Sequence, residues 1–207
     1  GEHADHRARV GGPADRHLGS DPSGSTALVP AAGLVLAAGE GRRFGGPKAP
    51  AVVDGERLVD RAVRILREGG CNPIAVVLGA WVGEVQGAQI VVNDEWPEGM
   101  GSSVRAGLGA LEADRIVITL VDLPGMSAEA IRRFVDSPSR LAQGAFGGER
   151  GHPVVIGSEH VDGVVRAARG DRGARDYLRE HAAEVSVIEI GDVASGEDLD
   201  EPPAPPR

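Results

Sequence analysis

The sequence has a single cysteine, Cys71, among its 207 residues. One cysteine excludes an intramolecular disulfide framework, and no Cys/His pattern with zinc-ligand spacing is present. Acidic residues outnumber basic ones, 31 against 22, for a net charge of −9; this argues against a protein that binds nucleic acid through a broad basic surface. No apolar run approaches the roughly 18 residues of a membrane-spanning helix. We therefore expect a cytoplasmic protein that binds neither nucleic acid nor membrane.

The remaining composition fits one globular domain. Apolar residues make up 41% and charged residues 26% of the chain, which is usual for globular proteins, and the length suffices for one substantial core. Residues 1–30 are polar and lack the apolar centre of a signal peptide, so we expect a disordered extension or a cloning remnant there. The proline-rich end predicts a disordered tail over 203–207. The folded domain should span residues 31–202.

Short apolar runs alternate with segments of helical spacing across this domain. The alternation predicts an α/β fold: a single domain with a mostly parallel, doubly wound sheet and helices on both faces. The runs are continuously apolar, as strands buried on both faces should be. We expect strands at 33–38, 74–79, 88–93, 115–121, 152–157 and 184–190, and helices at 57–68, 102–111, 127–135 (with Ser127 as N-cap), 161–168 and 173–181.

Ligands of such sheets bind beyond the carboxyl ends of the strands. The segments that follow the expected strands are therefore the candidates for function. They are residues 39–48, Gly79, 93–103, 122–124 and 192–201.

The segment after the first strand is a glycine-rich loop that also carries Arg42, Arg43 and Lys48. Glycines let backbone N–H groups approach an anion, and the cationic side chains neutralise phosphate. The ATPase phosphate loop requires Gly-Lys-Ser/Thr, but Gly46 is followed by proline; the dinucleotide fingerprint fails because Phe44 stands where its third glycine belongs. The loop is thus a phosphate-binding loop of another type.

Residues 36–48, LAAGEGRRFGGPK, resemble the signature of the nucleoside-triphosphate transferase superfamily, L-A-A-G-x-x-x-R-x-G-x-x-K. Later segments are similar to the molybdenum cofactor cytidylyltransferase family, itself similar to molybdopterin guanylyltransferase. Residues 93–104 match N-x-x-W-x-x-G-x-x-x-S-L except at Val104, 122–124 match D-x-P, 151–153 match G-H-P, and 170–175 match G-D-x-G-A-R; 198–202 resemble D-I-D-T-P, with Glu201 for Thr. The resemblance spans residues 33–202 and implies the Rossmann-like fold of nucleotide-diphospho-sugar transferases.

The resemblance implies a Mg²⁺-dependent enzyme that transfers CMP from CTP to the terminal phosphate of molybdenum cofactor (molybdopterin), releasing pyrophosphate. Lys48, Arg43 and Asp122 would be catalytic, because cations and positioning suffice when the attacking phosphate is already anionic. Asp122 and Asp200 would hold Mg²⁺, which prefers hard oxygen ligands. Asp198 is an alternative second ligand, as is Asp192 if the last motif is aligned differently.

The resemblance also implies contacts to both substrates. The nucleotide would lie against Leu36, Ala37, Ala38, Gly39, Glu40, Gly41, Arg43, Lys48, Gly79, Asn93, Ser103 and Asp122. The acceptor would lie against His152, Asp171, Arg172 and Arg175. Structural roles stay open for several of these residues: Asn93 as a strand-end turn residue, His152 as a structural histidine, and Asp171, Arg172 and Arg175 at a solvated helix N-terminus, where an aspartate is ordinary.

Three functions are compatible with these motifs. Ala38 stands where guanylyltransferase relatives tend to have glycine, which favours CTP. The alternative is a GTP-dependent guanylyltransferase acting on molybdopterin or another phosphorylated acceptor. The third is a non-catalytic chaperone that delivers a cofactor to a molybdenum-dependent oxidoreductase, although carriage alone does not require Lys48, Arg43 and Asp122.

Overall fold

The computed structural model describes residues 31–201; the extension expected over residues 1–30 and the tail over 203–207 lie outside the described residues. The elements in chain order are β1 (Ala32–Leu36), β2 (Val52–Val53), β3 (Glu56–Arg57), α1 (Leu58–Glu68), β4 (Ile74–Leu78), β5 (Gln89–Val92), the 3-10 helix η1 (Trp96–Glu98), α2 (Met100–Gly109), β6 (Arg115–Leu120), α3 (Ala128–Asp136), β7 (Leu141–Phe146), β8 (Glu149–Gly157), α4 (Ser158–Ala167), the 3-10 helix η2 (Gly170–Arg172), α5 (Arg175–Glu180) and β9 (Ser186–Glu189).

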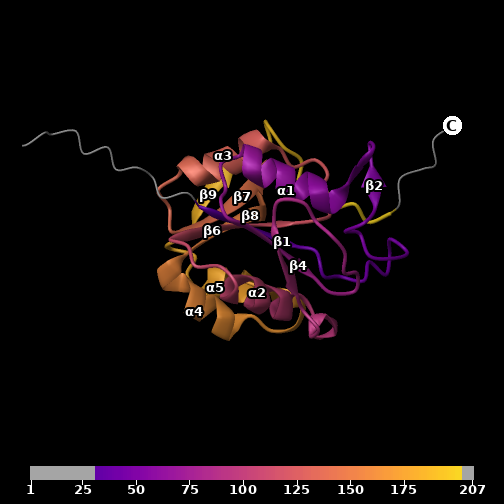
Figure 1. The fold of residues 1–207 in the computed structure, drawn as a ribbon. Coiled ribbons are helices and arrows are strands. Elements are labelled where there is room, and N and C mark those ends of the chain that lie inside the picture. Colours follow the sequence, from indigo (N-terminus) through magenta and orange to yellow (C-terminus); the bar gives the residue numbers. More distant parts are fainter. Residues whose placement is uncertain (1–30, 202–207) are drawn as a thin grey trace, which may run out of the picture.

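Seven strands form one sheet in the order β5-β4-β1-β6-β8-β7-β9 (Figure 1). β1 pairs in parallel with β4 and β6, β4 with β5, and β7 with β9. β8 alone in this sheet runs antiparallel to both of its neighbours, β6 and β7. The predicted mostly parallel sheet is confirmed. Because β7 therefore runs in the direction of β6, the ends of β1, β4, β6 and β7 and the start of β8 meet at one edge.

The helices form two layers around the sheet. α1 and α3 cover one face, and α2, α4 and α5 cover the other (Figure 1). Every residue of β1 and β4 is buried, since successive side chains alternate between the two layers: Val35 packs toward α1 and α3, and Leu34 toward α2 and α4. This two-sided burial is why these strands are continuously apolar.

The expected helices form, with small shifts at their ends. α3 begins after Ser127, whose Oγ accepts a hydrogen bond from the Ala130 backbone N–H at 3.1 Å, so the predicted N-cap is confirmed. α2 begins two residues before the expected start because Gly99, with φ of 104°, already turns the chain into it. The last helix begins at Arg175, after the short η2 turn.

The sequence patterns missed β7 and the small β2–β3 hairpin. The β7 residues, LAQGAF, include no β-branched side chain. A two-residue turn joins β7 to β8 through Gly147 and Gly148, whose φ angles are 59° and 89°; positive φ at both positions is typical of a tight hairpin. β8 consequently starts at Glu149, before the expected strand.

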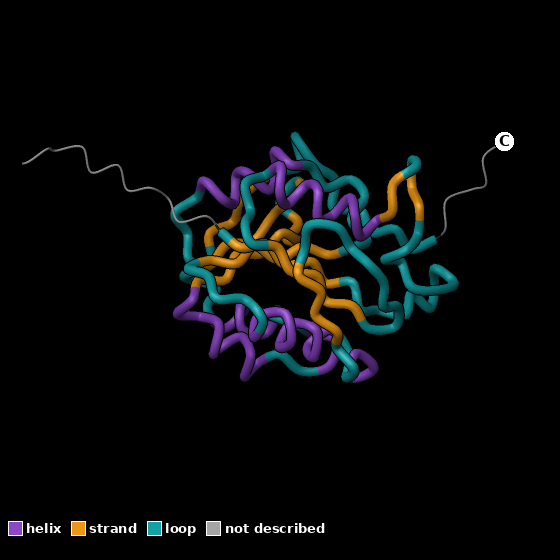
Figure 2. Tube along the Cα trace, viewed as in Figure 1, coloured by secondary structure: helices purple, strands orange, loops and turns teal. Residues whose placement is uncertain are grey.

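Loops gather at the edge of the sheet where the parallel strands end (Figure 2). They include the segments after β1, β4, β5 and β6 that sequence reasoning selected. Within residues 31–201, no helix is long and apolar enough to cross a membrane.

Candidate active site

The glycine-rich loop after β1 folds back on itself. The backbone N–H groups of Gly45 and Gly46 both donate to the Gly41 carbonyl, at 2.9 and 3.1 Å. Gly41 has a φ of 62°, and a Cβ there would lie 2.0 Å from the Gly46 carbonyl oxygen. Only glycine fits that position without movement of the loop. The tight turn carries Arg43 into solvent and leads to Lys48.

Lys48 and Asp122 form an ion pair at the centre of this edge. The Lys48 Nζ donates to Asp122 Oδ2 at 2.8 Å, and their side chains are only 14% and 23% exposed. Asp122 lies just beyond β6, where the Val121 N–H donates to the Leu36 carbonyl at 3.1 Å and so holds the ends of β6 and β1 together. The partial burial places this pair, from two distant segments, in a setting less screened than the surface.

The segment 191–200, called here the C-terminal strap, brings a second carboxylate to the pair. The Leu199 N–H donates to the Asp122 carbonyl at 2.9 Å, and Asp200 then lies 3.1 Å from Arg43 and 3.8 Å from Lys48. Two cations and two carboxylates therefore alternate within one cluster. The structure brings together all four residues that sequence reasoning assigned to catalysis and metal binding.

The other two carboxylates considered for the metal differ in position. Asp192 is held by Arg133 on α3, with two contacts of 2.7 Å, and belongs to a different ion pair. Asp198 lies near the cluster; partial burial, then repulsion from Asp122 and Asp200, raises the pKa of its carboxyl. Among residues 31–201, no group of three or more His, Cys, Asp or Glu side chains has a geometry suited to a metal. Of the carboxylates considered, Asp122 and Asp200 contact Lys48, and Asp198 lies near both of them.

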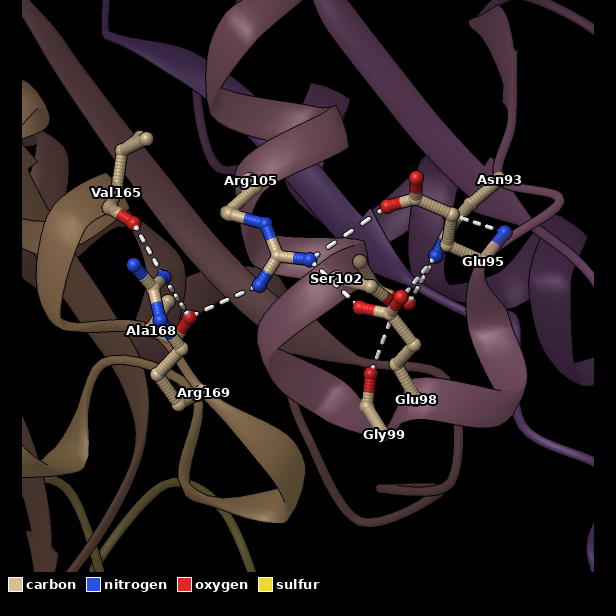
Figure 3. Close-up of polar contacts among 10 residues, drawn as sticks. Asn93, Glu95, Glu98, Gly99, Ser102, Arg105, Val165, Ala168 and Arg169 are labelled. Carbon is tan, nitrogen blue, oxygen red and sulfur yellow. Dashed lines mark hydrogen bonds and ion pairs between the residues drawn. The ribbon is translucent and has the colours of Figure 1, made fainter.

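Asn93 and Ser103 are joined directly. The buried Asn93 amide donates to the hydroxyls of Ser102 and Ser103 at 2.9 and 3.1 Å, and its oxygen accepts from the Glu95 N–H (Figure 3). All of these contacts are internal, so Asn93 fixes the end of β5 to the start of α2. These hydrogen bonds give Asn93 the structural role of a strand-end residue, and the bond to the Ser103 hydroxyl also positions Ser103.

The Trp96 side chain occupies the space next to Gly79. A Cβ on Gly79 would lie 2.7 Å from the Trp96 side chain. The indole therefore packs against the backbone where β4 ends, and any larger residue would displace it.

Arg105, on α2, links this region to the C-terminal end of α4. It lies 3.0 Å from Glu98 and 3.5 Å from Glu95, and it donates to the Ala168 carbonyl at 2.9 Å, as Arg169 also does (Figure 3). The two arginines thus satisfy a carbonyl at the C-terminal end of α4, a favourable place for cations.

The four residues predicted to bind the acceptor have different contacts and do not form one group. His152 lies within β8 and is partly buried, with Nδ1 3.4 Å from the Ile118 carbonyl; desolvation lowers the pKa of its imidazole, and the contact to Ile118 and the charge of Asp122 offset part of that effect. Arg172 is paired with Asp176 at 3.1 Å. Asp171 lies against Gly99, where a Cβ would be 2.5 Å from its Oδ1. The charge of Arg175 also lowers the pKa of the His152 imidazole, whereas Arg172 is paired with Asp176 on α5.

Sequence reasoning missed residues at the β7–β8 turn that lie at this same edge. Phe146 and Arg150 line a cavity there together with the C-terminal strap. The pair of glycines at 147 and 148 was the available signal, because such a pair between two apolar or alternating segments indicates a hairpin.

Residues 33–185, which include Lys48 and Asp122, match the family model described as the MobA-like NTP transferase domain. The chain is 38% identical over 194 residues to nicotine blue oxidoreductase from Paenarthrobacter nicotinovorans, covering 86% of this chain and 95% of that protein. It is 38% identical over 101 residues to a probable molybdenum cofactor guanylyltransferase from Opitutus terrae, covering 47% of this chain and 50% of that protein.

The fold is shared with solved structures. Rv0371c from Mycobacterium tuberculosis H37Rv superposes with a TM-score of 0.72 at 23% identity, over 84% of this chain and 94% of that one. That protein has also been solved as a complex with manganese, for which the TM-score is 0.67 at 21% identity, over 82% of this chain and 94% of that one. By the match of its sequence to the family model over most of its length, the chain belongs to the family of MobA-like NTP transferase domains.

Proposed function

We propose that this protein transfers CMP from CTP to the terminal phosphate of molybdenum cofactor. The observation that carries the proposal is the cluster of Lys48, Arg43, Asp122 and Asp200 beside the glycine-rich loop. The family relationship supports nucleotidyl transfer as the reaction class. Ala38 in the loop supports cytidine over guanosine.

The reaction depends more on stabilising negative charge than on a general base. An oxygen of the acceptor phosphate attacks the α-phosphorus, the bond from that phosphorus to the bridging oxygen breaks, and pyrophosphate leaves with the electron pair. The attacking phosphate is already anionic, so no strong base is needed. Lys48 and Arg43 neutralise the triphosphate and the charge that grows on the leaving group, and the loop N–H groups hold the phosphates in place.

Asp122 and Asp200 would hold Mg²⁺. The donor set fits, because Mg²⁺ is usually bound by one or two carboxylates together with substrate phosphates and water. When bound, the ion would stabilise negative charge on the phosphates. The manganese complex of a fold neighbour supports a divalent ion in this fold. Without substrate, Lys48 and Arg43 satisfy the two carboxylates, so substrate binding exchanges these ion pairs for contacts to phosphate and metal.

His152 and Arg175 serve as acceptor contacts in this proposal. His152 has a lowered pKa and is therefore neutral at neutral pH. It can hydrogen-bond an acceptor oxygen but brings no charge, and Arg175 supplies the nearby cation.

The test is to offer each of the four triphosphates with Mg²⁺ and molybdopterin and to measure pyrophosphate and the nucleotide product. Turnover with CTP alone supports the proposal. Turnover with GTP alone assigns a guanylyltransferase instead. Binding without turnover of any triphosphate supports the cofactor-delivering chaperone, whose partner would be a molybdenum-dependent oxidoreductase.

The 38% identity to a protein named nicotine blue oxidoreductase, over 86% of this chain, favours a second candidate function, an oxidation or reduction of nicotine blue or a similar dye. Reduction requires an electron donor and no triphosphate. Incubation with reduced nicotinamide nucleotides and nicotine blue, followed by absorbance measurements, separates the two functions. Dye reduction that is unaffected in Lys48→Met, without nucleotide transfer in the wild type, would replace the first proposal.

A further inference from the structure

β5 is the outer strand at one end of the seven-stranded sheet, and one of its faces lacks a helix. Residues 79–88 cross from β4 to β5 without a helix among them, whereas a crossover between parallel strands usually contains one. Ala88 packs on the α1–α3 core and Val91 on the opposite core. By alternation, Ile90 and Val92 face the α1 side, where they are 39% and 50% exposed. These two side chains form an exposed apolar strip.

The outward side of β5 also presents main-chain groups. The Asn93 N–H donates to the Leu78 carbonyl of β4 at 2.8 Å. Because main-chain groups point alternately to the two sides of a strand, Ile90 and Val92 direct their N–H and C=O groups away from β4. Within residues 31–201, no strand lies beyond β5. These groups are therefore available to a further strand.

The sequence of β5 does not protect it against such pairing. Its residues, QIVV, include no charge and no proline, which are the usual means by which outer strands avoid pairing. The outer strand at the other end of the sheet, β9, has the sequence SVIE and ends in a glutamate. Copies of a chain with a net charge of −9 repel one another, so a neutral strand is a place where two of them can approach closely.

We propose that two copies of this chain associate through β5, with the two strands antiparallel, to form one continuous sheet. A two-fold axis perpendicular to the sheet uses the same surface on both copies and keeps their α1 faces on the same side. With Val91 on this axis, Ile90 lies opposite the partner's Val92, and Val92 lies opposite the partner's Ile90. The main-chain groups of these residues point outward, so each pair exchanges two hydrogen bonds. The apolar strips of the two copies then join.

The same register brings opposite charges together. Asp94, two residues after the end of β5, lies opposite the partner's Ala88 when the register is continued. Arg67 of α1 lies beside the neighbouring residue, Gly87: its Nη2 donates to the Gly87 carbonyl, and a Cβ on Gly87 would lie 2.0 Å from it. Asp94 and Arg67 are both exposed and form no salt bridge with another side chain of residues 31–201. A second copy thus supplies both the missing strand and the complementary charges.

Four variants of the full chain test the interface. Ile90→Lys places a charge in the apolar strip, and Val187→Lys is its matched control, because Val187 is an apolar residue of β9 with a similar exposure of 46%. Arg67→Asp and Asp94→Arg each reverse one charge. Sedimentation velocity at roughly 1–200 μM covers the affinities of weak interfaces. Thermal melts establish that each variant is folded.

We expect the wild type to form a dimer, with twice the 21.4 kDa of one chain, at the upper concentrations. Ile90→Lys should raise the dissociation constant of the dimer about tenfold or more, whereas Val187→Lys leaves it unchanged. Arg67→Asp and Asp94→Arg should each weaken association alone. An equimolar mixture of these two variants should recover it, because each charge in the mixed dimer then faces its opposite.

The measurement requires no substrate, and the interface includes none of the residues proposed for nucleotidyl transfer, so it is independent of the proposed function. A wild type that stays monomeric over the whole concentration range would overturn the inference. A dimer weakened by Val187→Lys but not by Ile90→Lys would do the same. Absence of recovery in the mixture, with both variants folded, would refute the antiparallel register.

Discussion

Replacing Lys48 by methionine separates the role of this residue in folding from its role in binding. Methionine keeps an apolar stem of similar length and removes only the ammonium group. Asp122 then loses its 2.8 Å partner, but its side chain is 23% exposed and can be hydrated. The backbone bond from Leu199 to the Asp122 carbonyl does not involve the lost group. We therefore expect a loss of only about 1 kcal/mol, at the upper end for a partly exposed pair, which lowers the melting temperature by about 2–4 °C at this chain length.

The effect on triphosphate binding should be larger. A hydrogen bond to a charged group contributes ~1.5–3 kcal/mol, and a bond to a phosphate in a partly buried position belongs in this range. The KM for the triphosphate should accordingly rise about 10- to 100-fold. Arg43 is 84% exposed, and its loss should matter less.

The measurements are thermal melts of wild type and Lys48→Met without ligand, and initial rates over a range of triphosphate concentrations. Lys48→Arg is the matched control: it restores the charge, so it should recover part of the affinity although its planar head cannot reproduce the same contact. A large drop in melting temperature with an unchanged KM would show that Lys48 is a structural residue and refute its role in the site.

Four further outcomes are expected. Asp122→Asn should reduce turnover by more than about 100-fold, because it removes a charge from the metal pair, while the melting temperature falls only by the few degrees expected for Lys48→Met, since the same ion pair is lost; activity near the wild-type rate would remove the metal assignment. Asp192→Asn, in contrast, should leave the rate unchanged and lower the melting temperature only slightly, because Asp192 pairs with Arg133 at the surface, away from the site. Gly41→Ala should raise the triphosphate KM, since a Cβ would meet the Gly46 carbonyl; an unaltered KM would show that the loop adapts. The hydrogen bond from Arg140 lowers the pKa of Glu159 from 4.5 to about 2. The ionised group therefore stabilises the fold above about pH 4.5, and this contribution is lost as the pH falls toward 2. Glu159→Gln should reduce the dependence of the melting temperature on pH in this range, by a modest amount because the side chain is half exposed.

The parallel core of the fold could be predicted because strands buried on both faces are continuously apolar in sequence. β1, β4 and β6 are apolar at almost every position, and their order in the sheet follows the usual switch point. β7 could not be recognised in the same way. Its residues are small, and its strand character depends on pairing with β8 and β9, which are distant constraints that local propensity does not carry.

The residues that follow strand ends could be placed in the site from sequence. The residues positioned by contacts between distant segments could not. Lys48 and Asp122 follow the ends of neighbouring strands, so their proximity follows from topology. The choice between Asp192 and Asp200 depended on the path of the strap, which is set by the Arg133 pair and by the bond from Leu199 to Asp122. The cavity beside Phe146 needed β7, and therefore could not be expected before the sheet order was known.

The pair formed by Lys48 and Asp122 also makes the site directly observable. Of the 22 basic residues, Lys48 is the one lysine and the other 21 are arginines. Reductive methylation with ¹³C-formaldehyde would therefore label one side chain of this sequence, in addition to the terminal α-amino group of the sample. Arrival of phosphate, exchange of Asp122 for a substrate oxygen and departure of product could all be followed on that single resonance.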